Sequence, residues 1–230
     1  NSGRDVDREG LVLERAALAG AVGARIGDGL AGTAAAGAGG SGDHLAEPAA
    51  QLELAWQWRP NERPLPDKTQ PGNFQATPLM IDDVLYLSTS FNRVVALNAQ
   101  TGSELWVFDP KAYLDGPGIN LYYQHRGVAF WREGSEARVF MNSHGRLFSL
   151  DARTGQLVTS FGQGGYATLR DGLRNHDKRI EMRQSSPPVI YKNLVIVGSS
   201  IPDRLQYKFD PPGTVQAVDV RTGKRVWVFY

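Results

Sequence analysis

The segment Val94-Val-Ala-Leu-Asn-Ala-Gln-Thr-Gly-Ser-Glu-Leu-Trp-Val-Phe108 decides the fold, because the chain contains two further versions of it, Leu147–Phe161 and Val215–Phe229. The Thr-Gly pair within them begins at Thr101, Thr154 and Thr222. The copies are therefore 53 and 68 residues apart. Repeats of roughly 20–50 residues, lengthened by insertions, are typical of solenoids, propellers and other repeat arrays.

Each copy has the pattern of a β-hairpin. Asn98, Asp151 and Asp219 each begin an Asx-x-x-Thr-Gly turn, in which the Asx side chain can bond its own backbone and glycine tolerates positive φ. In the first copy the arms are Val94–Leu97 and Leu105–Phe108, and we expect the same layout in the other two.

Two more strand-like runs precede each hairpin. They are Thr77–Ile81 with Val84–Ser88, then Gly127–Trp131 with Arg138–Asn142, and finally Pro188–Tyr191 with Leu194–Gly198. Four antiparallel strands per repeat are the blades of a β-propeller. The sequence thus predicts an all-β chain, a partial β-propeller of about three four-stranded antiparallel blades. Leu52–Trp58 resembles the last strand of a preceding blade.

Trp106 and Trp227 occupy the same place in their repeats, four residues after the turn glycine, and the second copy has Thr159 there. We expect the tryptophans to pack between neighbouring blades, where burial of so large a ring contributes a few kcal/mol. The alternative is a role in ligand binding.

Propellers close with about four to eight blades, so about three predict a fragment of a longer protein. The alternative is a stand-alone chain that oligomerises to cover its edges. Residues 52–230 would form the incomplete propeller domain.

Residues 1–51 have a different composition. Between Ala16 and Gly42, 19 of 27 residues are Ala or Gly and none is aromatic. Such a segment buries too little apolar area to offset its ordering entropy, so we expect a disordered linker with a weak helix over Leu11–Ala24. A frameshifted stretch is the alternative, because the repeat pattern begins abruptly at Leu52.

The bulk composition excludes several classes. The formal net charge of +1 does not favour a nucleic-acid partner. Zero cysteine excludes disulfides and thiolate metal sites. The four histidines lack metal-ligand spacing, and no catalytic Ser-His-Asp set or phosphate loop is visible.

The repeat also gives each polar residue a phase. Aligning the first strands places Gln75, Arg126 and Ser185 at one equivalent position just before the innermost strand, where they should converge at one mouth of the channel. The loop Gly198–Asp203 opens on the same end. Each candidate also has a plainer alternative role. Gln75 could satisfy the backbone at a strand end, Arg126 could form a surface salt bridge, and Ser185 could be a turn residue. Asp203 could be a solvated loop acid, and His144 could be a structural turn histidine.

At this point the residues resemble a known family. Ala/Ser-x-Asp-x-x-Thr-Gly-x-x-x-Trp is similar to the tryptophan-docking motif of quinoproteins, eight-bladed propeller dehydrogenases that use pyrroloquinoline quinone (PQQ). The resemblance covers about Leu52 to Tyr230. It includes Phe74–Pro78, His125–Trp131, Asn142–Leu147, Phe161–Gly165 and Ser185–Asp203.

The resemblance implies a set of cofactor-binding residues, which are Gln75, Arg126, Ser185, Ser200, Ile201 and Pro202. It further implies that Asp203 ligates Ca²⁺ (or Mg²⁺). PQQ is a planar tricarboxylate, so Arg forks and hydroxyl donors suit it. A hard cation with oxygen ligands would polarise the quinone carbonyl.

Departures from the family pattern narrow the prediction. Alcohol-type members have adjacent cysteines where this chain has Asn120-Leu121, and the layout is closer to the glucose, quinate and shikimate group. The family's general base and its quinone-polarising Lys or Arg belong to later blades. No catalytic residue is therefore expected in this chain, which alone would be inactive.

The resulting prediction is a fragment of a PQQ-dependent dehydrogenase that oxidises a sugar, polyol or alcohol and passes electrons to ubiquinone or another respiratory acceptor. The resemblance implies a periplasmic location and inner-membrane association through segments outside this chain. The alternative is a non-enzymatic PQQ-repeat scaffold similar to an outer-membrane assembly lipoprotein.

Overall fold

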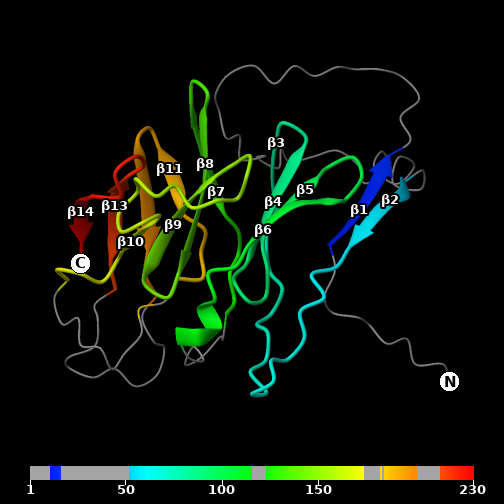
Figure 1. Ribbon diagram of the computed structural model, residues 1–230, viewed down its shortest axis with the longest axis horizontal. Helices are drawn as coiled ribbons and strands as arrows, with labels where there is room; N and C mark the ends of the chain where they lie inside the picture. Colours follow the sequence, from blue (N-terminus) through cyan, green and yellow to red (C-terminus); the bar gives the residue numbers. More distant parts are fainter. Residues whose placement is uncertain (1–10, 17–51, 116–122, 174–181, 183, 201–212) are drawn as a thin grey trace, which may run out of the picture. The chain divides into compact units, whose positions relative to one another are not determined.

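Among the residues that the structure describes, three four-stranded antiparallel sheets lie within the larger of the two units of the chain (Figure 1). The computed structural model describes residues 11–16, 52–115, 123–173, 182, 184–200 and 213–230. One unit contains Arg59–Tyr230 and the other is Gly10–Trp58. Among the described residues there is no helix of the length and apolar character that a bilayer crossing needs.

Each sheet pairs its strands in chain order. The first sheet holds β3 (Leu79–Ile81), β4 (Val84–Ser88), β5 (Val94–Asn98) and β6 (Glu104–Phe108). The second holds β7 (Ala129–Glu133), β8 (Glu136–Ser143), β9 (Arg146–Asp151) and β10 (Tyr166–Thr168). The third holds β11 (Val189–Tyr191), β12 (Leu194–Gly198), β13 (Val215–Asp219) and β14 (Arg225–Phe229). This confirms the predicted all-β architecture of three four-stranded blades.

The Asx turns form as predicted. Asp219 Oδ1 accepts hydrogen bonds from the Thr222 N–H and hydroxyl, both at 2.8 Å, and Asp151 Oδ1 makes the same pair with Thr154. The glycine that follows each threonine has φ near +70°, a backbone conformation that favours glycine. One short sequence pattern therefore builds three nearly identical turns.

The second sheet departs from the predicted layout in two places. Its first hairpin turns at Gly134, so β7 and β8 continue to Glu133 and from Glu136, two residues further on each side than the repeat of the first copy suggested. Its fourth strand is β10, and the expectation that Val158–Phe161 would form that strand is wrong.

An insertion displaces the fourth strand. Leu157 still pairs with Leu150, and this pair is equivalent to Leu97 and Glu104, where β6 of the first sheet begins. Ser149 then accepts from Val158 N–H at 2.9 Å and donates its own N–H to Gly165 at 3.0 Å, so the residues between leave the sheet as a loop. Tyr166 faces Phe148, where the spacing of the first sheet would place Ser160. The loop is thus an insertion of six residues.

The first junction between sheets is built by a tryptophan. Trp106 donates from Nε1 to the Ala152 carbonyl at 3.0 Å, and Tyr86 donates its hydroxyl to the same oxygen at 3.2 Å. The Trp106 ring lies so close to Gly155 that an added Cβ there would be 2.5 Å from it. Packing of Trp106 between blades is therefore confirmed, and a mixed core of both sheets surrounds it.

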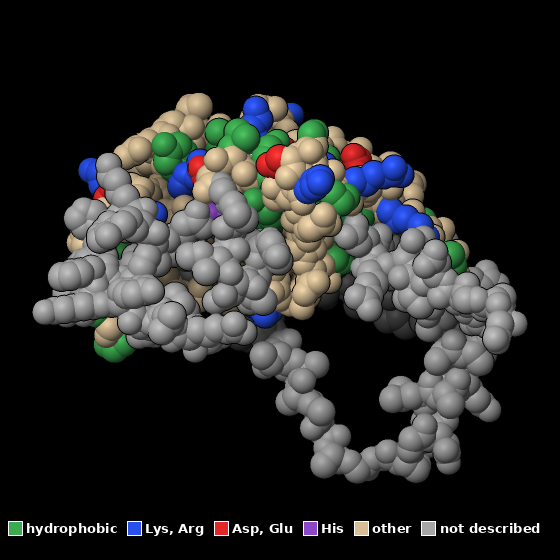
Figure 2. Space-filling view, turned by 90° about the horizontal axis from the view of Figure 1, so that it is seen from below, with side chains coloured by type: hydrophobic (Ala, Val, Ile, Leu, Met, Phe, Trp, Pro, Cys, Tyr) green, Lys and Arg blue, Asp and Glu red, His purple; other side chains and the backbone are tan. Residues whose placement is uncertain are grey.

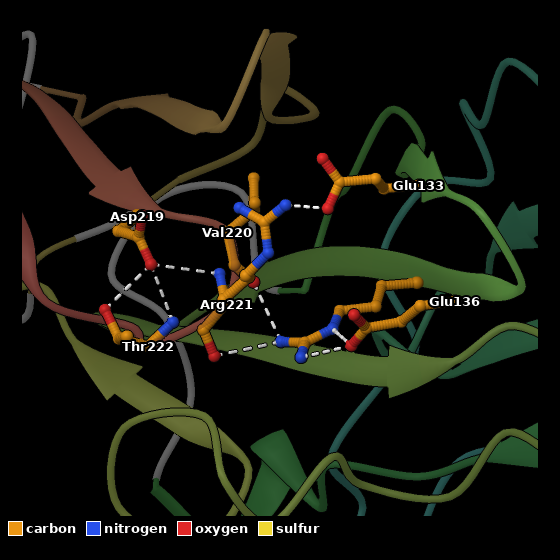
Figure 3. Close-up of polar contacts among 7 residues, drawn as sticks. Glu133, Glu136, Asp219, Val220, Arg221 and Thr222 are labelled. Atoms are coloured by element: carbon orange, nitrogen blue, oxygen red, sulfur yellow. Dashed lines mark hydrogen bonds and ion pairs between the residues drawn. The ribbon is translucent and has the colours of Figure 1, made fainter.

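The second junction uses an arginine in place of the absent tryptophan (Figure 3). Arg138, with a side chain only 5% exposed, donates from Nη1 to the carbonyls of Val220 at 2.8 Å and Arg221 at 3.1 Å. Its Nε bonds Glu136 at 2.7 Å. Val220 follows the turn Asp219 as Ala152 follows Asp151, so the same carbonyl position is capped at both junctions.

The inserted loop fills the remaining volume at this second junction. Phe161 is fully buried in the core shared by the second and third sheets. Gly162 donates its N–H to the Thr222 carbonyl at 3.0 Å, and a Cβ on Gly223 would lie 2.7 Å from that nitrogen. The loop backbone therefore packs on the Thr-Gly turn where the first junction has an indole ring.

Trp227 is the third repeat's equivalent of Trp106 and is 40% exposed.

In the smaller unit, β1 (Leu11–Ala16) pairs antiparallel with β2 (Leu52–Trp58). The expected weak helix is therefore wrong for Leu11–Ala16, because backbone pairing with β2 holds that segment extended. The rest of residues 1–51 lies outside the described residues.

Candidate functional site

The segments that enter the first strand of each sheet lie side by side. Arg126 donates its backbone N–H to the Ser185 carbonyl, and Thr77 donates its own to the Arg126 carbonyl, both at 2.9 Å. Gly127 has a φ of +147° and lies where a Cβ would come within 3.0 Å of the Thr77 carbonyl. Glycine is therefore needed at the point where the first and second entry segments meet.

Side chains of these entry segments also meet. Arg126 donates from Nη1 to the Ser185 hydroxyl at 2.9 Å. Gln75 accepts a hydrogen bond on Oε1 from Gln124 Nε2. Arg126 and Gln75 are exposed and Ser185 is half-buried, whereas Gln124 is 6% exposed. The structure thus joins two of the candidates directly and holds the third on a buried glutamine that the sequence did not single out.

The alignment that gave all three candidates one equivalent position is wrong by one residue for Arg126. Gln75 and Ser185 each lie six residues before the strand residue that ends the first hairpin arm, Ile81 or Tyr191. In the second sheet the matching residue is Trp131, opposite Arg138, and counting back six residues reaches His125. The longer hairpin of this sheet hid the offset.

His125 is a buried residue that the sequence did not mark as a site candidate. It is 1% exposed, and its Nε2 lies 3.1 Å from Asn142 Oδ1. The pKa of His125 is lowered to about 4, chiefly because burial desolvates the ring; the Asn142 hydrogen bond opposes this shift, and the nearby Arg126 charge adds to it. A lone histidine before Arg-Gly carries no sequence signal of burial, so only the fold reveals it.

The remaining candidates fall at or beyond the edge of the described residues. Ser200 is exposed and ends one described stretch, while Ile201, Pro202 and Asp203 lie outside the described residues. The residues that the structure describes contain no group of three or more His, Asp or Glu able to hold a metal ion.

His144 has the contacts of a turn residue. It adopts a φ of +48°, its Nδ1 is 3.0 Å from the Ser143 hydroxyl, and its ring centroid is 5.6 Å from that of Tyr123. These contacts support the structural role expected for a turn histidine.

The donor set suits an anionic, carboxylate-bearing group. A guanidinium has five N–H donors, and the Ser185 hydroxyl takes one from Arg126. Gln184, directly before Ser185, accepts from the Gly145 N–H at 3.1 Å, and its buried Nε2 has no hydrogen-bond partner among the described residues. An unpaired buried donor calls for an explanation such as a bound acceptor. On the face seen in Figure 2, basic side chains lie in several places with acidic ones between them.

Comparison with known proteins assigns the family. The family described as "Glucose/ethanol/alcohol dehydrogenase, beta-propeller domain", labelled PQQ, matches residues 46–230, and the chain belongs to it. The quinoprotein glucose dehydrogenase of Gluconobacter oxydans (strain 621H) is 32% identical over 198 residues, covering 77% of this chain and 24% of that protein.

Further relatives support the same assignment. The quinate/shikimate dehydrogenase (quinone) of Acinetobacter baylyi (strain ATCC 33305 / BD413 / ADP1) is 28% identical over 205 residues, covering 78% of this chain and 24% of that protein. The crystal structure of quinohemoprotein alcohol dehydrogenase from Comamonas testosteroni matches with a TM-score of 0.53 and 26% identity, over 69% of this chain and 21% of that one. The chain spans about a quarter of the length of these curated relatives.

Proposed function

We propose that this chain is part of a PQQ-dependent dehydrogenase that oxidises a sugar or polyol, and that its strand-entry segments bind one side of the cofactor. The observation that carries the proposal is the contact between Arg126 and Ser185, within a chain that belongs to the quinoprotein propeller family. The relatives' names include glucose, quinate/shikimate, glycerol and alcohol dehydrogenases.

The proposed roles follow from the chemistry of the side chains. The Arg126 guanidinium would hold a carboxylate of PQQ, with the Ser185 hydroxyl beside it as a second donor. Gln75 would present a neutral amide, whose orientation the Gln124 bond fixes. The chemistry that PQQ supplies when bound is acceptance of hydride from the carbon bearing the substrate hydroxyl.

The finer assignments extend the same proposal. Ser200, Ile201 and Pro202 would complete the cofactor's surroundings, and Asp203 would supply an oxygen ligand to Ca²⁺ or Mg²⁺. The full protein would act in the periplasm and deliver electrons to ubiquinone or another respiratory acceptor. Its general base would come from blades beyond those described here.

Equilibrium titration of the full-length gene product with PQQ, with and without Ca²⁺, tests the proposal. Arg126→Gln should weaken PQQ binding by about 10- to 100-fold, the loss of one charge-assisted hydrogen bond of roughly 1.5–3 kcal/mol. Arg132→Gln is the matched control, since Arg132 is an exposed arginine near the other end of β7, paired with Asp82. It should change PQQ affinity less than about twofold.

Two outcomes would contradict the proposal. Equal losses for Arg126→Gln and Arg132→Gln would mean that general charge, and not the strand-entry site, governs binding. No quinone binding by the unmodified protein, together with no dye-linked oxidation of glucose, quinate or ethanol, would favour the cofactor-free scaffold.

A further inference from the structure

His125 is buried beside the candidate cofactor residues. It precedes Arg126 in the chain and is 1% exposed. Its Nδ1 lies 3.3 Å from the Ser88 hydroxyl and accepts from the Gly127 N–H, also at 3.3 Å. Its Nε2 lies 3.1 Å from Asn142 Oδ1. Both ring nitrogens therefore have partners in a site closed to water.

The partners determine which ring nitrogen carries the proton. Asn142 Nδ2 donates at 3.1 Å to the Ser186 carbonyl, which can only accept, so Asn142 Oδ1 is the atom that faces the ring. Nε2 must then be the donor to Oδ1. Gly127 N–H can only donate, so Nδ1 must be the acceptor. A protonated ring would set two N–H groups against each other in a buried site, which agrees with the lowered pKa of His125.

This hydrogen-bonded chain connects all three sheets. Ser88 ends β4 of the first sheet, Asn142 lies on β8 of the second, and Ser186 lies in the segment that enters β11 of the third. The candidate donors are the chain neighbours of its members, since Arg126 follows His125 and Ser185 precedes Ser186. A shift of the imidazole would therefore move both ends of the Arg126–Ser185 contact.

We propose that His125 is a positioning residue of the cofactor site. Its neutral ring, protonated on Nε2, works with Asn142 to set the spacing of Arg126 and Ser185, and it does not itself contact the cofactor. This inference rests on the proposed function, because it concerns the geometry of the same donors.

Two substitutions of His125 in the full-length gene product test the inference by PQQ titration, well below the unfolding temperature. His125→Leu removes every ring hydrogen bond and should weaken binding by about 10- to 100-fold, the loss typical when binding groups are misplaced by a fraction of an ångström to an ångström. His125→Gln keeps a donor for Asn142 Oδ1 and should restore affinity to within about threefold of the unmodified protein.

A matched control separates positioning from stability. Val195→Ala creates a cavity at a fully buried position of the third sheet and changes no member of the hydrogen-bonded chain. It should lower thermal stability and leave PQQ affinity unchanged. If it weakens PQQ binding as much as His125→Leu does, the role of His125 is structural only and the inference fails.

Asn142→Asp gives a second route should His125→Leu fail to fold. It replaces the donor to the Ser186 carbonyl by an acceptor with almost no change in volume, and it should also weaken PQQ binding by about tenfold or more. Unchanged affinity in this variant would overturn the inference.

Nitrogen NMR of the cofactor-free protein adds a readout that needs no PQQ. The His125 ring should show the neutral form with the proton on Nε2, and a charged ring or a proton on Nδ1 would overturn the inference. If the unmodified protein binds no PQQ, the proposed function fails. If it binds PQQ and His125→Leu binds it equally well, only the positioning role fails.

Discussion

Arg138→Met is the sharpest test of how the second and third sheets are joined. Arg138 is buried, and its guanidinium caps two backbone carbonyls of the third sheet's Thr-Gly turn while its Nε bonds Glu136 (Figure 3). Methionine retains much of the apolar stem and removes the donors. The substitution therefore isolates the hydrogen bonds from the packing.

The magnitude follows from burial. Val220 is fully buried, so its carbonyl would lose a charged donor without gaining water, which costs about 2–4 kcal/mol of unfolding free energy. The Glu136 side chain is 45% exposed and returns to solvent when the pair is broken, so Glu136→Gln should cost only about 0–1 kcal/mol.

Urea unfolding of the full-length protein, followed by tryptophan fluorescence, measures both variants. Because the important bonds go to buried carbonyls, the loss in Arg138→Met should persist at about 1 M NaCl, where exposed ion pairs are screened. If Glu136→Gln destabilises as much as Arg138→Met, or if high salt abolishes the difference, the surface pair governs the junction and the reasoning is refuted.

Three further predictions concern single sites. Gly155→Ala should cost about 3 kcal/mol, because of its φ of +70° and the Trp106 ring 2.5 Å from an added Cβ, while Gly134→Ala, with φ of +56° and open space, should cost about 1 kcal/mol; similar losses in urea unfolding would contradict this. Trp106→Phe should cost only about 1–2 kcal/mol, because the Tyr86 hydroxyl still caps the Ala152 carbonyl, and a loss in urea unfolding as large as that of Trp106→Ala would contradict this. His125 should make stability fall by about 3 kcal/mol as the pH drops from about 6.5 to about 4, because in that window only the unfolded state binds the proton; His125→Gln should flatten this part of a stability–pH curve, and an unchanged slope would refute the assignment.

The parts of the fold that local chemistry controls could be predicted from the sequence. The Asx-x-x-Thr-Gly turn is specified by a side-chain acceptor and a glycine within five residues, so three copies were found without any tertiary information. The strand before each of these turns is a mostly apolar run that the structure buries nearly continuously, with Val94–Leu97 of β5 all buried and Gln216–Val218 of β13 likewise. Register across the first hairpin of the second sheet was not predictable, because two extra residues on each arm lengthen it without changing its strand-like character.

The candidate cofactor site could be predicted only in part from the sequence. Phase along the repeat brought Gln75, Arg126 and Ser185 to one end, and the structure places Arg126 on Ser185. Gln124 and His125 could not be predicted from the sequence, because their importance lies in contacts with other sheets. A polar residue before a strand has the same appearance in sequence whether water or another blade surrounds it.

The second blade explains why a motif based on tryptophan gives an incomplete account of this fold. Thr159 occupies the position of the tryptophan, so by the motif alone this blade would lack the side chain that packs against its neighbour. The structure instead meets both physical demands of the junction separately: Arg138 supplies the donor to the carbonyl after the Asx residue, and the Phe161 loop supplies the buried volume. The requirement shared by these two junctions is therefore a capped carbonyl and a filled space, and the identity of the side chain is secondary. Because these two elements are distant in sequence, the compensation is visible only once the sheets are assembled.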